Sequence, residues 1–425
     1  MGFWDIEDDI EDFIEDDFVQ EEDNKYLASE AEAVRLISKV IPLSTKSQQS
    51  RATIQKLNNM LDVDFLSAFR NVQLKDEAHL QMKLISLSDK LVEQKKNKIL
   101  KNKSVVGIGG KFSAGKSKFI NSILKAGENL LPEDQNPTTS IPTYIVYGQD
   151  ETISAYTTED DEVKLDLEAL QALTHKFYEK YEIGFSAFIN SLIISEPNIP
   201  YKSLVFLDTP GYSKADLMGK SKNQKDLTDE NKAYIQLRSV DYLIWLIDIE
   251  NGTLSEPDIA FISKLGLETP ILIVANKADK KIDEEIDEIV STIEYTAKDA
   301  GLNIFAVTAY SSRDNEEWNS AHYITSFLNQ AMKKKKSKDN ILEQIEEIYK
   351  SISEEINDKI NKKEKERNAL SDVIFKSNDI MEIKTLIDLY GEAMEEIRNL
   401  KICRRQFKSN VNKLKRKLEK HYGGR

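Results

Sequence analysis

Hydrophobic residues change their spacing twice along this chain of 425 residues. From about residue 25 to residue 102 they recur every three or four positions, as at Leu84, Leu87 and Leu91, which predicts helices. After residue 103, short apolar runs rich in β-branched residues alternate with helical stretches, and from residue 339 the helical spacing returns. This order predicts an α/β domain, a mostly parallel sheet flanked by helices, with a helical arm on either side of it in the sequence.

Eight apolar runs are predicted as strands, with helices at 256–265 and 282–299 between the later ones. Near the end, isoleucines from Ile341 to Ile360 form one apolar seam, which is typical of a coiled coil or of one face of a helix bundle. A second long helix is expected from about Ile380 to His421. The predicted strands are 104–109, 143–148, 152–158, 191–196, 203–211, 241–249, 270–277 and 303–310.

These changes divide the chain into four predicted parts. They are an acidic amino-terminal segment (1–24), an amino-terminal helical arm (25–101), the α/β domain (102–336) and a carboxy-terminal helical arm with a basic end (337–425). Because the two arms bracket the α/β domain, we expect them to form an all-α helical bundle together.

The net charge of −14 is distributed unevenly. Residues 1–23 contain twelve acidic residues and no basic one, whereas residues 398–425 contain eleven basic residues and one acidic residue. The single cysteine, Cys403, excludes an internal disulfide and favours a reducing compartment. No apolar run reaches the roughly 18 residues that a membrane-spanning helix needs. We therefore expect a cytoplasmic protein, with peripheral attachment to a membrane as an alternative.

A phosphate-binding motif follows the first predicted strand. Residues 110–117 read GKFSAGKS, the GxxxxGK[ST] pattern of a P-loop, and a helical pattern begins directly after them. The glycines let the backbone surround phosphate oxygens, while amide N–H groups and the helix N-terminus supply positive potential. The residues predicted to contact the phosphates are Gly110, Ser113, Ala114, Gly115, Lys116, Ser117 and Lys118.

Four of the predicted site residues have separate roles at the phosphates and the metal. Lys116 would reach the β- and γ-phosphates, and the Ser117 hydroxyl would be a ligand of Mg²⁺. Asp208, at the tip of a predicted strand, would hold the same metal through water. Gly211, in the sequence Asp-Thr-Pro-Gly, would offer its backbone N–H to the γ-phosphate, so that loss of this phosphate would release the following loop.

An Asn-Lys-Ala-Asp motif near residue 276 predicts that the base is guanine. The Asp279 carboxylate can accept hydrogen bonds from guanine N1–H and N2–H₂, donors that adenine does not present there. Asn276 would brace the loop, and the stem of Lys277 would lie along the base. Thr308 and Ala309 are predicted to form the last guanine-contacting turn.

Four segments, GKFSAGKSKFINSIL, LLPEDQNPTTSIPTYIVYG, ISEPNIPYKSLVFLDTPGY and NKAD, together resemble the GTPase domain of the dynamin superfamily, particularly of bacterial dynamin-like proteins. The resemblance covers about residues 102–336 and implies Mg²⁺-dependent hydrolysis of GTP to GDP and phosphate. It implies that Ser113 acts catalytically beside Lys116. It also implies that Thr139 is the switch-one threonine, a catalytic group and metal ligand, although the adjacent Thr138 is an alternative.

Two positions depart from the patterns of related enzymes. Phe112 stands where eukaryotic dynamins have a polar residue, and Tyr212 follows Asp-Thr-Pro-Gly where Ras-like enzymes have a water-orienting glutamine. The missing glutamine fits a family in which hydrolysis depends on P-loop groups completed by domain dimerisation. It fits a slow enzyme equally well. The carboxy-terminal arm is shorter than a dynamin stalk and its sequence shows no apolar tip, so membrane fission by this chain alone is not expected.

The charged ends point to several kinds of partner. Residues 398–425 form a basic amphipathic pattern that suits either an anionic membrane surface or the solvated face of a bundle helix. Nucleic acid is disfavoured because interleaved aromatic residues are scarce. The acidic segment suits either a peptide that docks on the basic end of the same or a neighbouring molecule, or an unstructured tail.

Two functions are consistent with these features. The first is a dynamin-like GTPase whose nucleotide state, GTP or GDP, controls formation of a homodimer or oligomer and movement of the helical arms, with a companion dynamin-like chain as a further partner. The second is a slow GTP-dependent switch or scaffold that recruits a protein partner without membrane remodelling. An immunity-related GTPase is a less similar alternative.

Overall fold

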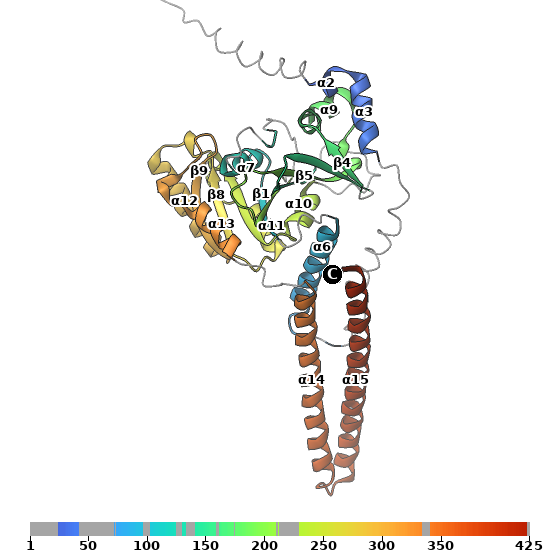
Figure 1. Ribbon diagram of the computed structural model, residues 1–425. Coiled ribbons are helices and arrows are strands. Elements are labelled where there is room, and N and C mark those ends of the chain that lie inside the picture. Colours follow the sequence, from blue (N-terminus) through green and yellow to red (C-terminus); the bar gives the residue numbers. More distant parts are fainter. Residues whose placement is uncertain are drawn as a thin grey trace, which may run out of the picture. The chain divides into compact units, whose positions relative to one another are not determined.

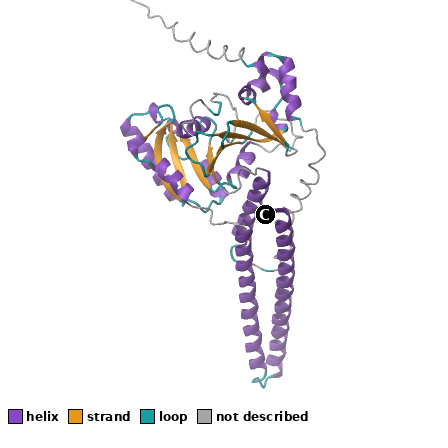
Figure 2. Cartoon of the chain, viewed as in Figure 1, coloured by secondary structure: helices purple, strands orange, loops and turns teal. Residues whose placement is uncertain are grey.

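The computed structural model describes residues 24–41, 72, 74–96, 103–124, 130–132, 141–158, 161–173, 175–209, 211, 229–333 and 341–422. The chain divides into two compact units. One comprises residues 1–47 and 97–336 and contains the sheet, and the other comprises residues 48–96 and 337–425 and is helical in its described part (Figures 1 and 2).

A ten-stranded mixed sheet forms the centre of the first unit, with the strand order β10-β9-β8-β7-β1-β6-β2-β5-β3-β4. Its central strands, from β9 through β1 to β6, run parallel. All eight predicted strands are present; β4 and β10 are short, and their mixed polar sequences did not predict strands. The strands are β1 (Ser104–Gly110), β2 (Thr143–Tyr147), β3 (Thr152–Thr157), β4 (Glu162–Leu165), β5 (Ile189–Glu196), β6 (Leu204–Asp208), β7 (Tyr242–Asp248), β8 (Ile271–Asn276), β9 (Ile304–Ser311) and β10 (Glu316–Glu317).

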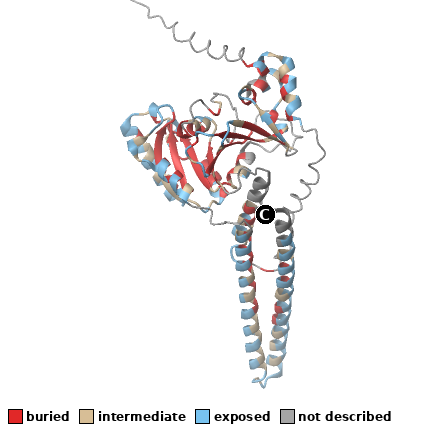
Figure 3. Ribbon diagram, viewed as in Figure 1, coloured by how far each residue is buried: buried red, intermediate tan, exposed pale blue. Residues whose placement is uncertain are grey.

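Both faces of the sheet are covered, so its central strands are apolar on both sides. Along β7, for example, Ile244 and Leu246 enter one hydrophobic cluster, and Leu243 and Trp245 enter the other. Figure 3 shows the resulting buried strands between more exposed helices. The helices and short 3₁₀ turns are α7 (Lys116–Leu124), α8 (Leu167–Ala172), α9 (His175–Tyr181), η3 (Phe185–Ala187), α10 (Asp229–Leu237), η5 (Ile249–Asn251), α11 (Glu256–Leu265), η6 (Ala278–Lys280), α12 (Asp283–Asp299), η7 (Trp318–Ser320) and α13 (Tyr323–Lys333).

The predicted amino-terminal arm is divided between the two units. Helices α2 (Lys25–Ala28) and α3 (Glu30–Val40) bury Leu27, Leu36 and Val40 in the same cluster as α8 and α9, so they belong to the sheet-containing unit. Only the later part of the arm, with α6 (Glu77–Lys96), lies in the helical unit. The apolar spacing predicts each helix but carries no information about which surface will bury its apolar face.

The helical unit is built on a hairpin of two long helices, α14 (Ile341–Ile374) and α15 (Ile380–Tyr422). The predicted isoleucine seam is buried from Ile345 to Ile360, and α6 adds Leu84 and Leu87 to the same core. Phe407 of α15 completes this core and meets Tyr349 of α14 edge to face, with ring centroids 5.2 Å apart. The structure thus confirms helical arms that pack together, through α6 rather than through the whole region 25–101. Among the described helices, none has the length and apolar character needed to cross a membrane.

The turn between α14 and α15 carries an exposed apolar tip that the sequence analysis did not predict. Phe375, Ile380 and Met381 have exposed fractions of 85%, 76% and 72%; Phe375 directly follows α14, and Ile380 and Met381 begin α15. Four polar residues, Lys376–Asp379, separate Phe375 from the adjacent Ile380 and Met381, so no continuous apolar run joins all three.

Candidate nucleotide site

The P-loop connects β1 to α7 through a backbone that requires glycine at two positions. Gly110 and Gly115 both have positive φ values, 140° and 78°. A Cβ on Gly110 would lie 2.4 Å from the carbonyl oxygen of Leu246, and one on Gly115 would lie 2.6 Å from Nδ2 of Asn276. Ser113, at the exposed crest of the loop, also has a positive φ of 37°. The motif therefore adopts a tight, closely packed turn directly before the helix N-terminus.

Lys116 is buried at the base of this loop. Its Nζ donates to the carbonyl oxygens of Lys111 at 3.1 Å and Gly110 at 3.4 Å. Burial lowers the pKa of Lys116 to about 8, although the nearby Asp208 carboxylate acts in the opposite direction. An ammonium group held only by two carbonyl oxygens is suited to exchange them for phosphate oxygens. Lys118, in the first turn of α7, is exposed.

Ser117 and Asp208 form the pair expected for a metal. The Ser117 hydroxyl donates to Oδ2 of Asp208 at 2.7 Å, and Oδ1 of Asp208 is buried with no hydrogen-bond partner among the described residues. Burial raises the pKa of Asp208, while Lys116 and Ser117 oppose this shift. A hydroxyl oxygen beside a buried, incompletely paired carboxylate fits Mg²⁺ bound directly by Ser117 and through water by Asp208. No group of three or more His, Cys, Asp or Glu side chains that could hold a metal occurs in the described part of the chain.

Gly211 lies against the P-loop from the end of β6. A Cβ at this position would be 2.6 Å from Cα of Phe112 and 3.0 Å from Nζ of Lys116. The Thr209 hydroxyl, two residues earlier, donates to the carbonyl oxygen of Ile108 at 2.7 Å and so ties this segment to β1. The structure therefore brings Gly211 to the phosphate loop. Thr139 and Thr138 lie outside the described residues, and the prediction for this threonine remains a prediction.

The loop after β8 is hydrogen-bonded directly to the P-loop. Buried Asn276 donates from Nδ2 to the carbonyl oxygen of Ala114 at 2.9 Å, and its Oδ1 accepts from the Ser312 hydroxyl at 2.7 Å. Lys277 adopts a left-handed conformation, with φ of 66°, and its Nζ pairs with Asp248 at 2.6 Å. The bracing role predicted for Asn276 thus has a structural basis, and the ion pair holds the stem of Lys277 on the β7 side of the loop.

The residues that contact Asp279 differ from those predicted for the last guanine-contacting turn. Thr308 and Ala309 are buried inside β9, where Thr308 donates to Glu317 at 2.9 Å. Instead, Ser311 at the end of β9 contacts Oδ1 of Asp279 at 3.0 Å, and Ser312 contacts Asn276 as described above. The sequence signal that could have identified Ser311 and Ser312 is the pair of serines directly after the apolar run of β9. They stand at the position where β9 ends beside β8.

The P-loop, the Ser117–Asp208 pair suited to Mg²⁺ and the loop of residues 276–279, which we call the base loop, all lie at the ends of strands. This arrangement defines a P-loop GTPase. Residues 106–278 match the model of the dynamin family, which identifies this part of the chain as a dynamin-like GTPase domain. Membership of the dynamin superfamily implies GTPase activity in general.

Individual similar proteins cover different parts of the chain. A protein of Caldicellulosiruptor sp. (strain Rt8B.4), named "Uncharacterized protein in xynA 3'region", is 28% identical over 281 residues, which are 61% of this chain and 64% of that protein. The chain thus spans less than two thirds of this relative's length.

Among solved structures, an oligomerised bacterial dynamin pair described as a mechanism for the long-range sensing and tethering of membranes matches with 19% identity and a TM-score of 0.43. This match covers 82% of this chain and 54% of the other. A bacterial selenocysteine-specific elongation factor, EF-Sec, matches with 12% identity and a TM-score of 0.31, over 55% of this chain and 29% of the other.

Proposed function

We propose that this protein binds GTP and hydrolyses it to GDP and phosphate at the candidate nucleotide site. One observation carries the proposal: the base loop and the phosphate loop are joined by the hydrogen bond from Asn276 to the Ala114 carbonyl oxygen, at 2.9 Å. A nucleotide that places its base beside Asp279 therefore meets a phosphate loop whose position is already set. Such preorganisation lowers the entropic cost of aligning the reacting groups.

Each residue of the site has a definite task in this proposal. Lys116 leaves the carbonyl oxygens of the loop and donates to the β- and γ-phosphates, and Ser113 helps to position the attacking water. Gly211 donates its N–H to the γ-phosphate, and Asp279 accepts from guanine. Mg²⁺, when bound by Ser117, Asp208 and Thr139, would neutralise charge on the phosphate oxygens.

Substitution of the P-loop lysine tests this function. Lys116→Ala should abolish GTP turnover and weaken nucleotide binding, because it removes the ammonium group that the carbonyl oxygens of Gly110 and Lys111 hold within the loop. The matched control is Lys298→Ala on α12, which removes an exposed lysine paired with Glu294. Normal GTP hydrolysis by Lys116→Ala would falsify the assignment of the site.

We further propose that the nucleotide state controls self-association of GTPase domains and movement of the helical arms. The contact of Gly211 with Phe112 and Lys116 supports this coupling, because a γ-phosphate must enter between these groups. Turnover measured across protein concentration distinguishes this mechanism from the alternative of a slow switch that recruits a protein partner. A specific rate that rises steeply with concentration supports self-association, whereas a flat and slow rate supports the switch.

The exposed hairpin tip favours peripheral association with a membrane as a second candidate function. Phe375, Ile380 and Met381 are nearly as exposed as free side chains, and exposed apolar clusters of this kind commonly mark interaction surfaces. Double substitution of Phe375 and Met381 by serine should reduce sedimentation with liposomes while leaving GTP turnover in solution unchanged. If the parent protein fails to sediment with neutral and anionic liposomes in the presence of GTP, this second function is wrong.

A further inference from the structure

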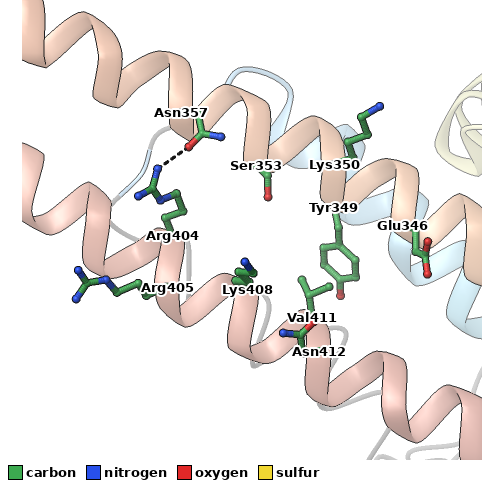
Figure 4. Close-up of a pocket in the computed structure, with 10 residues that line it drawn as sticks. All are labelled: Glu346, Tyr349, Lys350, Ser353, Asn357, Arg404, Arg405, Lys408, Val411 and Asn412. Carbon is green, nitrogen blue, oxygen red and sulfur yellow. Dashed lines mark hydrogen bonds between the residues drawn. The ribbon is translucent and has the colours of Figure 1, made fainter.

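The hairpin contains a hollow with basic side chains, within the helical unit and away from the P-loop motif in the sequence. It has a volume of about 710 Å³ and lies between α14 and α15, around Ser353 and Lys408 (Figure 4). Four basic residues and one acidic residue, Glu346, line it. This size is within the range of small-molecule sites in proteins. We call this hollow the basic groove.

Two facing rows of side chains build the basic groove. Tyr349, Ser353 and Asn357 are spaced four residues apart and therefore share one face of α14. The opposing row on α15, which has the same spacing, consists of Arg404, Lys408 and Asn412. Because the helices run antiparallel in the hairpin, Asn357 faces Arg404 and Ser353 faces Lys408, as Figure 4 shows.

The two rows meet at one end and are separated in the middle. Arg404 donates to Oδ1 of Asn357 at 2.9 Å, which closes that end. Within the described residues, neither Ser353 nor Lys408 has a hydrogen bond or an ion pair, although Figure 4 shows both side chains on the facing sides of the two helices. Tyr349, packed on Phe407, provides an apolar wall.

We propose that the basic groove binds a phosphate monoester, either as a free small molecule or as the headgroup of a lipid. Lys408 and the remaining guanidinium N–H groups of Arg404 supply positive charge, and Ser353 adds a hydroxyl donor. A phosphate monoester offers several acceptor oxygens and up to two negative charges, which this set of donors can satisfy together. Lys350 and Arg405 point away from the space between the helices in Figure 4 and contribute only at longer range.

Binding by the full-length protein in the presence of saturating GDP tests the proposal, because GDP then occupies the P-loop. The soluble probe is glycerol 3-phosphate, measured by calorimetry. The lipid probe is vesicles containing phosphatidic acid, which carries the same phosphate monoester, compared with vesicles of phosphatidylcholine alone. The groove variant is Arg404→Gln with Lys408→Gln. The matched control is Arg398→Gln with Lys413→Gln, which removes the same charge from exposed positions of α15 outside the groove.

We expect the groove variant to bind glycerol 3-phosphate roughly tenfold or more weakly, because two charge-assisted hydrogen bonds are lost. The control variant should bind like the parent. Binding of both probes, or of either one alone, supports the site and identifies the source of the phosphate. Equal binding by the groove variant and the parent, or an equal loss in the control variant, overturns the proposal.

Two further measurements keep the test decisive. An unchanged helical circular dichroism spectrum shows that the groove variant is folded, so that its loss of binding is a loss of the site. A synthetic peptide with the sequence of residues 1–23, which holds twelve acidic residues, is the competing ligand. If this peptide binds the parent and neither phosphate probe does, the groove is a peptide site and the proposal is wrong.

Discussion

The Nζ of Lys111, in the P-loop, lies 3.3 Å from Oδ2 of Asp258, at the start of α11. It also donates to the Ser255 hydroxyl at 2.9 Å, and Asp258 is buried. The main-chain carbonyl oxygen of the same lysine accepts from Lys116 at 3.1 Å. Lys111 therefore joins the phosphate loop to the N-terminus of α11, which lies far from the loop in the sequence.

Removal of this anchor should weaken nucleotide binding. We expect Lys111→Met to reduce GTP affinity several-fold and to lower the free energy of unfolding by about 1 kcal/mol, because Asp258 loses a charged partner but keeps its contacts with Ser255. Nucleotide titration and chemical denaturation measure the two effects. Lys111→Arg should restore most of both losses, and a Met variant with normal affinity would show that the anchor has no role in binding.

Asp279→Asn should change the preferred base. The substitution replaces the proposed acceptor for guanine N1–H and N2–H₂ with an amide, so GTP affinity should fall at least about 100-fold. The amide N–H₂ can donate to the O2 of xanthine, so binding of xanthosine triphosphate should improve. The matched control is Asp314→Asn, because Asp314 contacts the same Ser311 hydroxyl at 2.7 Å but belongs to the following turn. An unchanged preference for GTP in Asp279→Asn would remove this residue from base recognition.

Gly211→Ala should slow hydrolysis more than it weakens GDP binding. The added Cβ would lie 2.6 Å from backbone atoms of Phe112, so the segment after β6 must move away from the P-loop. Because GDP lacks the γ-phosphate to which Gly211 is proposed to donate, we expect turnover to fall roughly tenfold or more and GDP affinity to change much less. Gly391→Ala, on α15, has open space around the added carbon and serves as the control. Equal losses in turnover and GDP affinity would instead indicate a general distortion of the site.

Docking of α2 and α3 should depend on the ionisation of Asp166. Its Oδ2 accepts from Lys25 Nζ and from the Tyr26 hydroxyl, both at 2.9 Å. Burial alone would raise the pKa of Asp166, but hydrogen bonds from Lys25, the Ala169 backbone and Tyr26 outweigh it, so this pKa lies below its ordinary value of 3.8. The contribution of Asp166 to docking is therefore fully present above pH 3.8 and is lost as the pH falls through the lower folded-state pKa.

Hydrogen exchange of residues 30–40 measures this docking. Protection of α3 should decrease as the pH falls below about 4, once the intrinsic pH dependence of exchange has been corrected. Asp166→Asn should produce the same loss at neutral pH, because the neutral amide cannot pair with Lys25. Asp161→Asn, outside this contact, is the control. Persistent protection in Asp166→Asn would show that the apolar contacts of Leu36 and Val40 hold the helices without the ion pair.

Local sequence patterns predicted most of the sheet and much of the site. The runs that became β1, β6, β7 and β8 are apolar on both faces, and this property of buried parallel strands is visible without knowledge of their neighbours. The P-loop is also local, because Gly110 and Gly115 permit its backbone conformation and Lys116 and Ser117 follow in the same turn. In contrast, Ser311 and Ser312 gained their roles because β9 ends beside β8, which depends on strand register.

The sequence by itself determined the class of domain, the phosphate-binding motif and the extent of the second long helix, because periodicity and short motifs are properties of neighbouring residues. Only the tertiary structure decided that α2 and α3 pack beside α8 and α9, and that Arg404 and Lys408 face Ser353 and Asn357. Each of these outcomes joins residues that are far apart in the chain or depends on which helix face is buried. The free energy of such packing depends on both partner surfaces, and the pattern of one segment records only its own.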